Sequence, residues 1–189
     1  MKVQQRGYDA PEESGETETP EEEALENETP EQQSDSHFSS TYALKPNENY
    51  EVNGYSYETD RYGRITRCEG NLRLESGKRY LNHQVRAGGE YRLGTDVGGH
   101  LIADRFGGSG RVDNIVPMDA RLNDGDYKKM ENEWARELEK GNQVHVEIRC
   151  RYSGDSERPD SFMIKYKMTD QYGVDHYQTK RFRNEAGGE

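Results

Sequence analysis

Cysteine is scarce in this 189-residue chain, which contains only Cys68 and Cys150. Two cysteines cannot form the disulfide framework that holds a small secreted scaffold together. No cluster of cysteine and histidine with the spacing of a zinc site accompanies them. Both residues lie in strand-like runs, so we predict two buried thiols and no bridge between them.

Long apolar runs are missing as well. No stretch has the roughly 20 apolar residues that a membrane-spanning helix needs, so we expect no membrane partner. Residues 1–6 lack the apolar centre of a secretory signal peptide. The sequence therefore predicts a protein that is secreted by a signal-peptide-independent route, or that is cytoplasmic before export.

The net charge of −11 is concentrated near the N-terminus. Residues 1–45 hold twelve acidic and three basic side chains, and the rest of the chain is close to neutral. Residues 12–31 are mostly Glu, Thr and Pro, and they cannot bury enough apolar surface to offset the entropy of ordering. We predict a disordered acidic segment over residues 1–41 and a folded domain over residues 42–185. The segment is interpreted as a solvated linker; a phosphate mimic that shields a basic cleft is the alternative.

Alternating apolar residues predict an antiparallel sheet on both sides of the middle of the chain. Asn53-Gly54, between residues 50–52 and 55–57, is the signal of a tight hairpin turn. Apolar and polar residues also alternate over 144–150 and 162–168. Further strands are expected at residues 65–68, 79–85 and 176–182. Together with the helix described next, these strands indicate the α+β class.

The middle of the chain predicts a short strand end, a loop and one main helix. Residues 100–103 are the strand end, and the loop runs from 104 to 122. A loop of this length is usually functional. The helix is expected over 124–138, with Asn123 or Asp124 as its cap and Gly141 after its end. Its apolar stripe consists of Tyr127, Met130, Trp134 and Leu138.

Three residues in this region have the chemistry for cutting a phosphodiester bond. His100 can act as the general base, because a neutral imidazole is near its working pKa at neutral pH. Asn123 offers a neutral oxygen to a hard cation such as Mg²⁺, which needs few protein ligands. Glu131 follows Asn123 by eight residues, about two helical turns, so both are expected on one helix face. Its carboxylate can then ligate the cation or hold the cation's waters.

Each of these residues has an ordinary explanation when it is taken alone. Asn123 is a typical helix cap, and Glu131 is a typical solvated helix residue. Trp134 is expected in the core, and the glycines at 107, 108 and 110 are weak evidence for a phosphate cradle. The spacing of the three residues is what favours a site. The remaining histidines receive a structural interpretation: His37, His83, His145 and His176.

The combined pattern resembles a known family, the DNA/RNA non-specific endonucleases with a ββα-metal (His-Me finger) core. It is most similar to the members that form C-terminal nuclease domains of secreted bacterial toxins. The residues that carry the resemblance are Gly98-Gly99-His100-Leu101-Ile102-Ala103, Arg105-Phe106-Gly107-Gly108, Asp113-Asn114-Ile115-Val116-Pro117-Met118, Leu122-Asn123 and Glu131-Asn132-Glu133-Trp134. The resemblance implies that His100 is the general base, Asn123 the ligand of one Mg²⁺ (Mn²⁺ is the alternative ion), Glu131 the residue that orients metal-bound water, and Asn114 a brace for the loop.

One departure from the family pattern concerns the arginine that contacts the phosphate of the substrate, here called the phosphate clamp. Many members have Asp-Arg-Gly before the histidine, whereas this chain has Val97-Gly98-Gly99. The arginine that contacts phosphate is therefore missing from its usual position. Arg105, which lies where the strand opens into the loop, is the first candidate to replace it. The other candidates are Arg86 and Arg111.

The sequence therefore predicts a ββα-metal core in a central antiparallel sheet, and sugar-non-specific cleavage of DNA or RNA. An active nuclease endangers its own cell, so the toxin resemblance implies a cognate immunity or inhibitor protein. The alternative function is a catalytically inactive module that binds nucleic acid or protein. A zinc-dependent nuclease of the HNH type is a further alternative, but it commonly has a second histidine on the helix, and residues 124–141 contain none.

Overall fold

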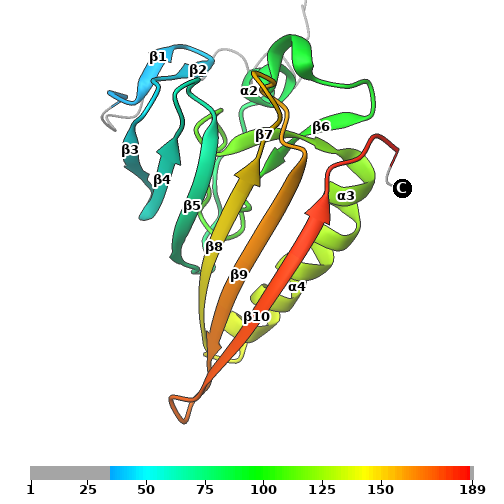
Figure 1. The fold of residues 1–189 in the computed structure, drawn as a ribbon. Helices are drawn as coiled ribbons and strands as arrows, with labels where there is room; N and C mark the ends of the chain where they lie inside the picture. Colours follow the sequence, from blue (N-terminus) through cyan, green and yellow to red (C-terminus); the bar gives the residue numbers. More distant parts are fainter. Residues whose placement is uncertain (1–34, 188–189) are drawn as a thin grey trace, which may run out of the picture. The chain divides into compact units, whose positions relative to one another are not determined.

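The computed structural model describes residues 35–187, and its centre is a six-stranded antiparallel sheet (Figure 1). The strand order is β10-β9-β8-β5-β4-β3. The strands are β3 (Asn49–Val52), β4 (Tyr55–Thr59), β5 (Ile65–Asn71), β8 (Gln143–Arg151), β9 (Ser161–Thr169) and β10 (Asp175–Arg183). The predicted α+β class with a central antiparallel sheet is confirmed.

The tight turn between β3 and β4 has the backbone that the sequence predicts. Asn53 and Gly54 both have positive φ, 54° and 84°, as a two-residue hairpin turn requires. Two short strands, β1 (Phe38–Ser40) and β2 (Ala43–Leu44), form a separate small sheet. Strand β1 lies inside the segment 1–41, so the described fold begins before residue 42. The predicted disorder of residues 1–34 lies outside the described residues.

The C-terminal strands follow the predicted alternation. Val144, Val146 and Ile148 on β8 are buried, and the residues between them face outward. Strand β9 pairs with β8 along its whole length, and β10 pairs with β9 in the same way. Cys68 and Cys150 are buried and free, which confirms the predicted pair of thiols.

Residues 79–85 do not form the predicted strand. They contain the start of helix α2 (Leu81–Arg86), which is followed by a 3₁₀ turn, η1 (Gly89–Tyr91). The apolar residues misled the prediction, because Leu81 and Val85 are exposed and the helix buries His83 instead. The imidazole of His83 accepts a hydrogen bond from the Val112 amide at 3.2 Å, so its structural interpretation holds.

The predicted loop 104–122 is wrong over its second half. Residues Ile115–Asp119 form strand β7, which pairs antiparallel with β6 (Asp96–His100), and His100 lies opposite Ile115. Every residue of β7 is buried, so the strand has no period of two in its sequence. Pro117 in its middle is a further signal against a strand.

The predicted helix is two helices. Helix α3 (Ala120–Asp124) follows β7 directly, and α4 (Asp126–Glu139) begins after a break at Gly125. The cap of α3 is Asp119, whose carboxylate accepts from the Arg121 amide at 3.0 Å. Asn123 and Asp124 are therefore inside α3 and are not the cap of the main helix, because Gly125 interrupts the helical backbone between them and α4.

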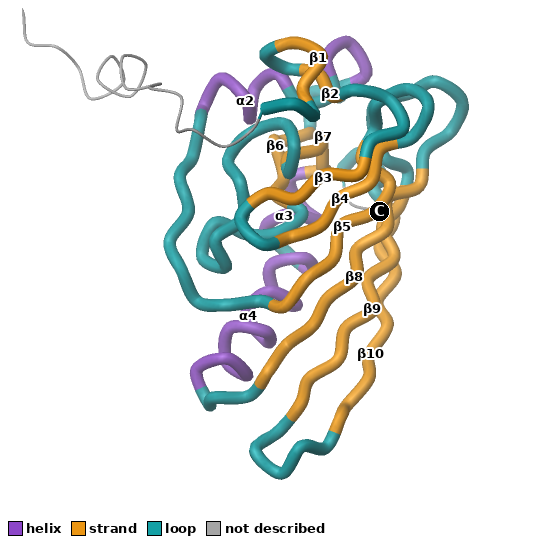
Figure 2. Tube along the Cα trace, turned by 90° about the vertical axis from the view of Figure 1, so that its left-hand side faces the viewer, coloured by secondary structure: helices purple, strands orange, loops and turns teal. Residues whose placement is uncertain are grey.

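Helix α4 packs on one face of the sheet, and no helix of the described residues covers the other face, as Figures 1 and 2 show from two directions. Its buried residues are Tyr127, Met130, Trp134 and Ala135, which confirms the predicted stripe, with Leu138 packed at its edge. The Trp134 ring meets Tyr166 of β9 edge-on, with ring centroids 5.4 Å apart. Gly141 follows the helix with φ of 85°, as predicted.

Candidate active site

The β6–β7 hairpin and the two helices after it position the residues predicted for the site. His100 is the last residue of β6. Asn123 lies on α3, which packs against both strands of the hairpin, and Glu131 lies on α4. The hairpin, the short α3 and the long α4 thus form a ββα unit. The argument that Asn123 and Glu131 share one helix face is wrong, because the break at Gly125 separates them.

The imidazole of His100 has a lowered pKa and a buried nitrogen without a hydrogen-bond partner in the described part of the chain. The side chain is largely covered, and its Nε2 is buried with no hydrogen-bond partner among the described residues. Burial lowers the pKa of His100 below the ordinary value of 6.5; the Asp104 carboxylate opposes this shift, and Arg79 adds to it. His100 is therefore neutral at neutral pH, which is the form that a general base requires.

The pKa of Glu131 is shifted upward, whereas that of His100 is shifted downward. Burial raises the pKa of Glu131 to about 7, the nearby Arg105 guanidinium lowers it, and Asp104 raises it. A carboxyl group with this pKa exchanges its proton near neutrality, unless a cation holds it in the charged form. Asp104 acts on both His100 and Glu131, so the field of this one carboxylate links the two predicted residues.

The three candidate arginines lie in different environments. Arg105 donates to Asn132 Oδ1 on α4 at 2.8 Å, and its charge acts on Glu131. Arg111 pairs with Asp35 at 2.8 Å, and Arg86 lies over the ring of Tyr42 at 5.5 Å. Of the three, Arg105 is the one whose charge acts on a predicted site residue.

The sequence analysis missed Arg79 and Asp104. The Arg79 Nε donates to Asp104 Oδ2 at 2.8 Å, and the Arg79 side chain is 68% exposed. Residues 75–77 run beside residues 104–107: the amides of Glu75 and Gly77 donate to the carbonyls of Arg105 and Asp104. Gly77 makes this approach possible, because a Cβ there would lie 2.8 Å from the Gly108 carbonyl oxygen. No periodic pattern in the sequence signals this contact.

Asn114 occupies the centre of the loop that follows His100. Its Oδ1 accepts from the Tyr57 hydroxyl at 2.7 Å and from the Ile102 amide at 3.0 Å. Its Nδ2 donates to the carbonyls of Ile102 and Ser109, both at 2.8 Å. All of these atoms are buried, so Asn114 ties both ends of the loop to the sheet.

A second set of contacts holds the same loop from outside. His37 Nε2 lies 3.0 Å from Asp113 Oδ2, and both side chains are buried. Ser109 donates to the other oxygen of Asp113 at 2.6 Å, and the Tyr50 hydroxyl donates to the Asp113 carbonyl at 2.7 Å. The structural interpretation of His37 therefore holds.

The donor set suits a hard cation better than a soft one. The described residues contain no group of three or more His, Cys, Asp and Glu side chains that could hold a metal ion. The side-chain nitrogen of Asn123 donates to Asp124 at 3.3 Å, which leaves its amide oxygen free to coordinate. An amide oxygen and a carboxylate are ligand types that Mg²⁺ accepts, because this ion prefers oxygen and keeps most of its waters.

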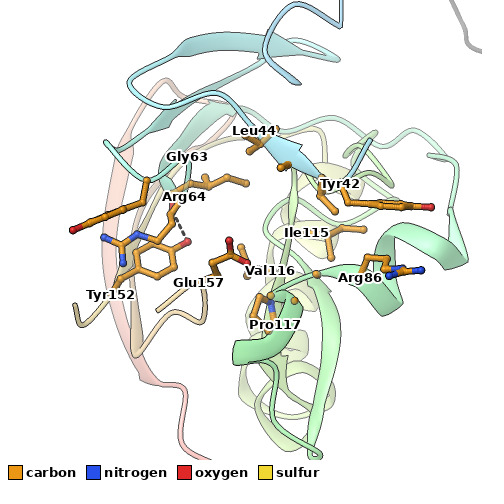
Figure 3. Close-up of a pocket in the computed structure, with 17 residues that line it drawn as sticks. Tyr42, Leu44, Gly63, Arg64, Arg86, Ile115, Val116, Pro117, Tyr152 and Glu157 are labelled. Carbon is orange, nitrogen blue, oxygen red and sulfur yellow. Dashed lines mark hydrogen bonds between the residues drawn. The ribbon is translucent and has the colours of Figure 1, made fainter. Parts of the chain in front are cut away.

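A cavity lined by described residues lies elsewhere in the fold. It has a volume of about 290 Å³ and lies between β2, the β4–β5 turn, α2 and β7. Arg86 and Tyr42 line one side, and Arg64 and Tyr152 line the other (Figure 3). None of the residues expected to act as base, brace or metal ligand lines this cavity, so it is separate from the site around His100.

This geometry defines the class of the protein: an α+β fold with a ββα-metal core of the kind found in nucleases. A model of the DNA/RNA non-specific endonuclease family matches residues 46–170, and the chain belongs to this family. The match includes the hairpin, both helices and most of the sheet, so the predicted membership is confirmed.

Two relatives illustrate the range of the similarity. The chain is 37% identical over 139 residues to the type VII secretion system protein EssD of Staphylococcus aureus, strain USA300. This alignment covers 69% of the chain and 23% of EssD, so the chain spans about a quarter of that protein's length. A chain in the crystal structure of the EndoG/EndoGI complex has the same fold, with a TM-score of 0.55 and 13% identity over 73% of this chain and 74% of that chain. Among the described residues, no helix combines the length and the apolar character that crossing a membrane requires.

Proposed function

We propose that this protein is a Mg²⁺-dependent, sugar-non-specific endonuclease that hydrolyses phosphodiester bonds of DNA or RNA. The observation that carries the proposal is the His100 imidazole, which is neutral and has a buried Nε2 without a partner. A neutral imidazole of this kind, which feels the same Asp104 carboxylate as Glu131 does, is suited to accept a proton from water. His100 is therefore the general base.

Glu131 and Asn123 supply the oxygen ligands of the proposed ion. A bound Mg²⁺ would offset charge on the scissile phosphate and on the leaving oxygen. Asn123 contributes a neutral amide oxygen, and Glu131 contributes a carboxylate that ligates the ion or orients its waters. Asn114 contributes no group to the reaction; it fixes the loop that follows His100.

Arg79 and Arg105 replace the arginine that is absent before His100. Both guanidiniums lie within electrostatic reach of the site: Arg79 acts on His100 and Arg105 acts on Glu131. An arginine meets two phosphate oxygens with two parallel N–H groups, which lysine cannot do. Arg79 has much of its side chain in solvent and is oriented by Asp104, so it joins Arg105 as a clamp candidate.

Plasmid nicking with Mg²⁺ and with chelator tests the proposed activity. Wild-type protein is expected to nick only with the divalent ion, and His100→Ala to lose the activity. His176→Ala is the matched control, because His176 is exposed and lies 3.1 Å from Asp170 at the β9–β10 turn. Activity in the His100 variant equal to that of the control would overturn the assignment of the base.

Metal binding separates the roles of the two ligands. Asn123→Ala is expected to lose both activity and Mg²⁺ affinity, and Glu131→Ala to lose more activity than affinity, because Glu131 can act through water. Calorimetry with each variant measures the affinity. Unchanged Mg²⁺ binding after Asn123→Ala would move the ligand to another residue.

An inactive module that binds nucleic acid or protein is the second candidate function. The observation in its favour is Gly98-Gly99 in place of the phosphate-contacting arginine. A wild-type protein that binds DNA but does not nick it with Mg²⁺ or Mn²⁺ would establish this candidate.

We also propose a secreted, toxin-like role with a cognate inhibitor protein. The similarity to a type VII secretion system protein supports export. An unexported active nuclease would cleave its own cell's nucleic acid, so a producing cell needs an inhibitor. Co-expression with the product of each neighbouring gene, scored by cell survival, tests this part.

A further inference from the structure

The face of the sheet opposite α4 carries charged side chains on every long strand. Over most of this face the charges are neutralised by neighbours. Arg67 on β5 contacts Glu58, Glu69 and Glu147, and His145 lies 3.0 Å from Glu69. Lys167 on β9 lies 3.8 Å from Asp175 on β10.

One corner of the same face is different. Arg149 and Arg151 point outward from β8, and Arg181 and Arg183 point outward from β10. The strand between them places Met163 and Ser161 in the two intervening positions: Arg149–Met163–Arg181 is one row, and Arg151–Ser161–Arg183 is the next. We call these four arginines the arginine grid.

The strand geometry fixes the dimensions of the grid. Neighbouring strands are about 4.8 Å apart, so the Cα atoms of the two columns are roughly 10 Å apart. Alternate residues on one strand are about 7 Å apart, so the two arginine Cα atoms of each column are separated by that interval. The four arginines therefore extend from a nearly rectangular set of backbone positions on an exposed surface.

The carboxylates near the grid pair with only two of its four arginines. Arg149 lies 2.6 Å from Glu147 and is 51% exposed, and Arg183 lies 3.3 Å from Glu185 and is 82% exposed. Arg151 and Arg181 are exposed and have no ion pair with any described residue. The grid therefore keeps a net positive charge that an external anion can balance.

We propose that the arginine grid binds the phosphate backbone of nucleic acid, as a surface separate from the catalytic site. Guanidinium groups match phosphate oxygens in pairs, and four of them at regular spacing can follow a chain of phosphates. The floor between them is Met163 and Ser161, so no aromatic ring stacks on a base and no base is read. The proposal rests on the proposed function only for the identity of the substrate.

The grid and Glu131 belong to opposite sides of the sheet, since α4 covers the other face. A short piece of nucleic acid cannot contact both. A long molecule can lie on the grid with one segment while another segment enters the site. The grid therefore raises the local concentration of long substrates and leaves the chemical step unchanged.

Binding and cleavage by an Arg151→Gln/Arg181→Gln variant test the proposal. Fluorescence anisotropy in chelator, where no cleavage occurs, measures affinity for a long and for a short DNA duplex. We expect about a tenfold loss of affinity for the long duplex at low salt, and a fall of about 2 in the slope of log K against log salt. Affinity for the short duplex, and kcat on it with Mg²⁺, should stay within twofold of wild type.

Lys140→Gln/Lys167→Gln is the matched control. It removes the same net charge, but from lysines that are paired with Glu137 and Asp175. If both variants lose affinity equally, the loss comes from the lower net charge and not from the grid, and the proposal is overturned. No loss in the grid variant also overturns it and leaves an acidic protein as the fitting partner. Binding is measured in chelator and does not depend on cleavage. A wild-type protein that fails to cleave would therefore refute the nuclease activity but leave the binding test of the grid valid.

Discussion

His100 and Asn114 are neighbours at the open end of the β6–β7 hairpin, yet their polar atoms are in opposite situations. The four hydrogen bonds of the Asn114 amide satisfy both of its polar atoms in a fully buried site. The Nε2 of His100 is buried with no partner among the described residues. A buried polar atom without a partner costs about 1–3 kcal/mol. Arg67 Nε and Trp134 Nε1 are also buried without a partner among the described residues, so what distinguishes His100 is that the charges of Asp104 and Arg79 act on it.

This contrast distinguishes residues that hold the loop in place from residues that are candidates for the chemical step. Asn114, Asp113 and His37 are held by their neighbours and hold the loop in turn. His100 and Glu131 have pKa values displaced by burial, in opposite directions. Perturbed groups in one region, next to a fully satisfied network, are typical of a catalytic site.

The largest expected effect comes from His100→Ala. Removing a general base lowers kcat by about 10²–10⁴. The contrast adds a second expectation: the melting temperature should stay the same or rise, because the variant removes a buried polar atom that has no partner. Kinetics on a short duplex and thermal unfolding of the same sample check both parts. A large drop in melting temperature would make His100 a structural residue.

Asn114→Ala should behave in the reverse way. The variant leaves two carbonyls, one amide and the Tyr57 hydroxyl without partners, so we expect a loss of about 3–5 kcal/mol of stability. Chemical denaturation measures it. Asn114→Asp is the companion variant, because it keeps the acceptor oxygen for the Tyr57 hydroxyl and the Ile102 amide but loses the donor to the Ile102 and Ser109 carbonyls. If Asn114→Ala is as stable as the wild type, the brace has no supporting role.

The parts of the fold that were predictable are those whose residues repeat along one face. The β3–β4 turn, the strands β8, β9 and β10, and the Tyr127–Trp134 stripe of α4 follow directly from such patterns. Strand β7 was not predictable because both of its faces are buried, and α2 was not predictable because its apolar residues face solvent. The break at Gly125 depends on a backbone conformation that its neighbours in sequence do not signal.

The candidate site likewise contains residues that a sequence pattern predicts and residues that it does not. The spacing of His100, Asn123 and Glu131 predicts a site, and their roles stay a prediction; the expectation that Asn123 and Glu131 share one helix face was wrong. Arg79 and Asp104 were missed because the contact joins residues 25 apart in two irregular segments. Such a contact depends on how Gly77 lets two backbones approach, and no short pattern in the sequence records it.

Replacing Arg79 or Arg105 is expected to lower kcat less than replacing His100 does. Arg79→Ala and Arg105→Ala should each lower kcat about 10–100-fold, because a charge-assisted contact to the transition-state phosphate is lost. The melting temperature should change little, since both side chains are partly or largely in solvent. Arg86→Ala and Arg111→Ala serve as controls and are expected to stay within threefold, because neither acts on His100 or Glu131. If all four variants stay within a few-fold of wild type, the site uses no arginine clamp.

The smallest effect concerns the stability of the metal-free protein and its dependence on pH. The pKa of Glu131 is raised by burial from 4.5 to about 7, so the folded state favours the protonated carboxyl. As pH rises from 4.5 to 7 the unfolded chain ionises first, stability falls across this window, and the loss is complete above pH 7. Glu131→Gln cannot ionise, so it should be more stable than wild type at pH 8 by about 1–2 kcal/mol, after allowance for solvent, and nearly equal to it at pH 5. Thermal unfolding in chelator at the two pH values measures the difference. A variant that is less stable than wild type at pH 8 would show that the charged carboxylate has a stabilising partner in the fold, and Glu131 would then belong with Asn114 among the supporting residues.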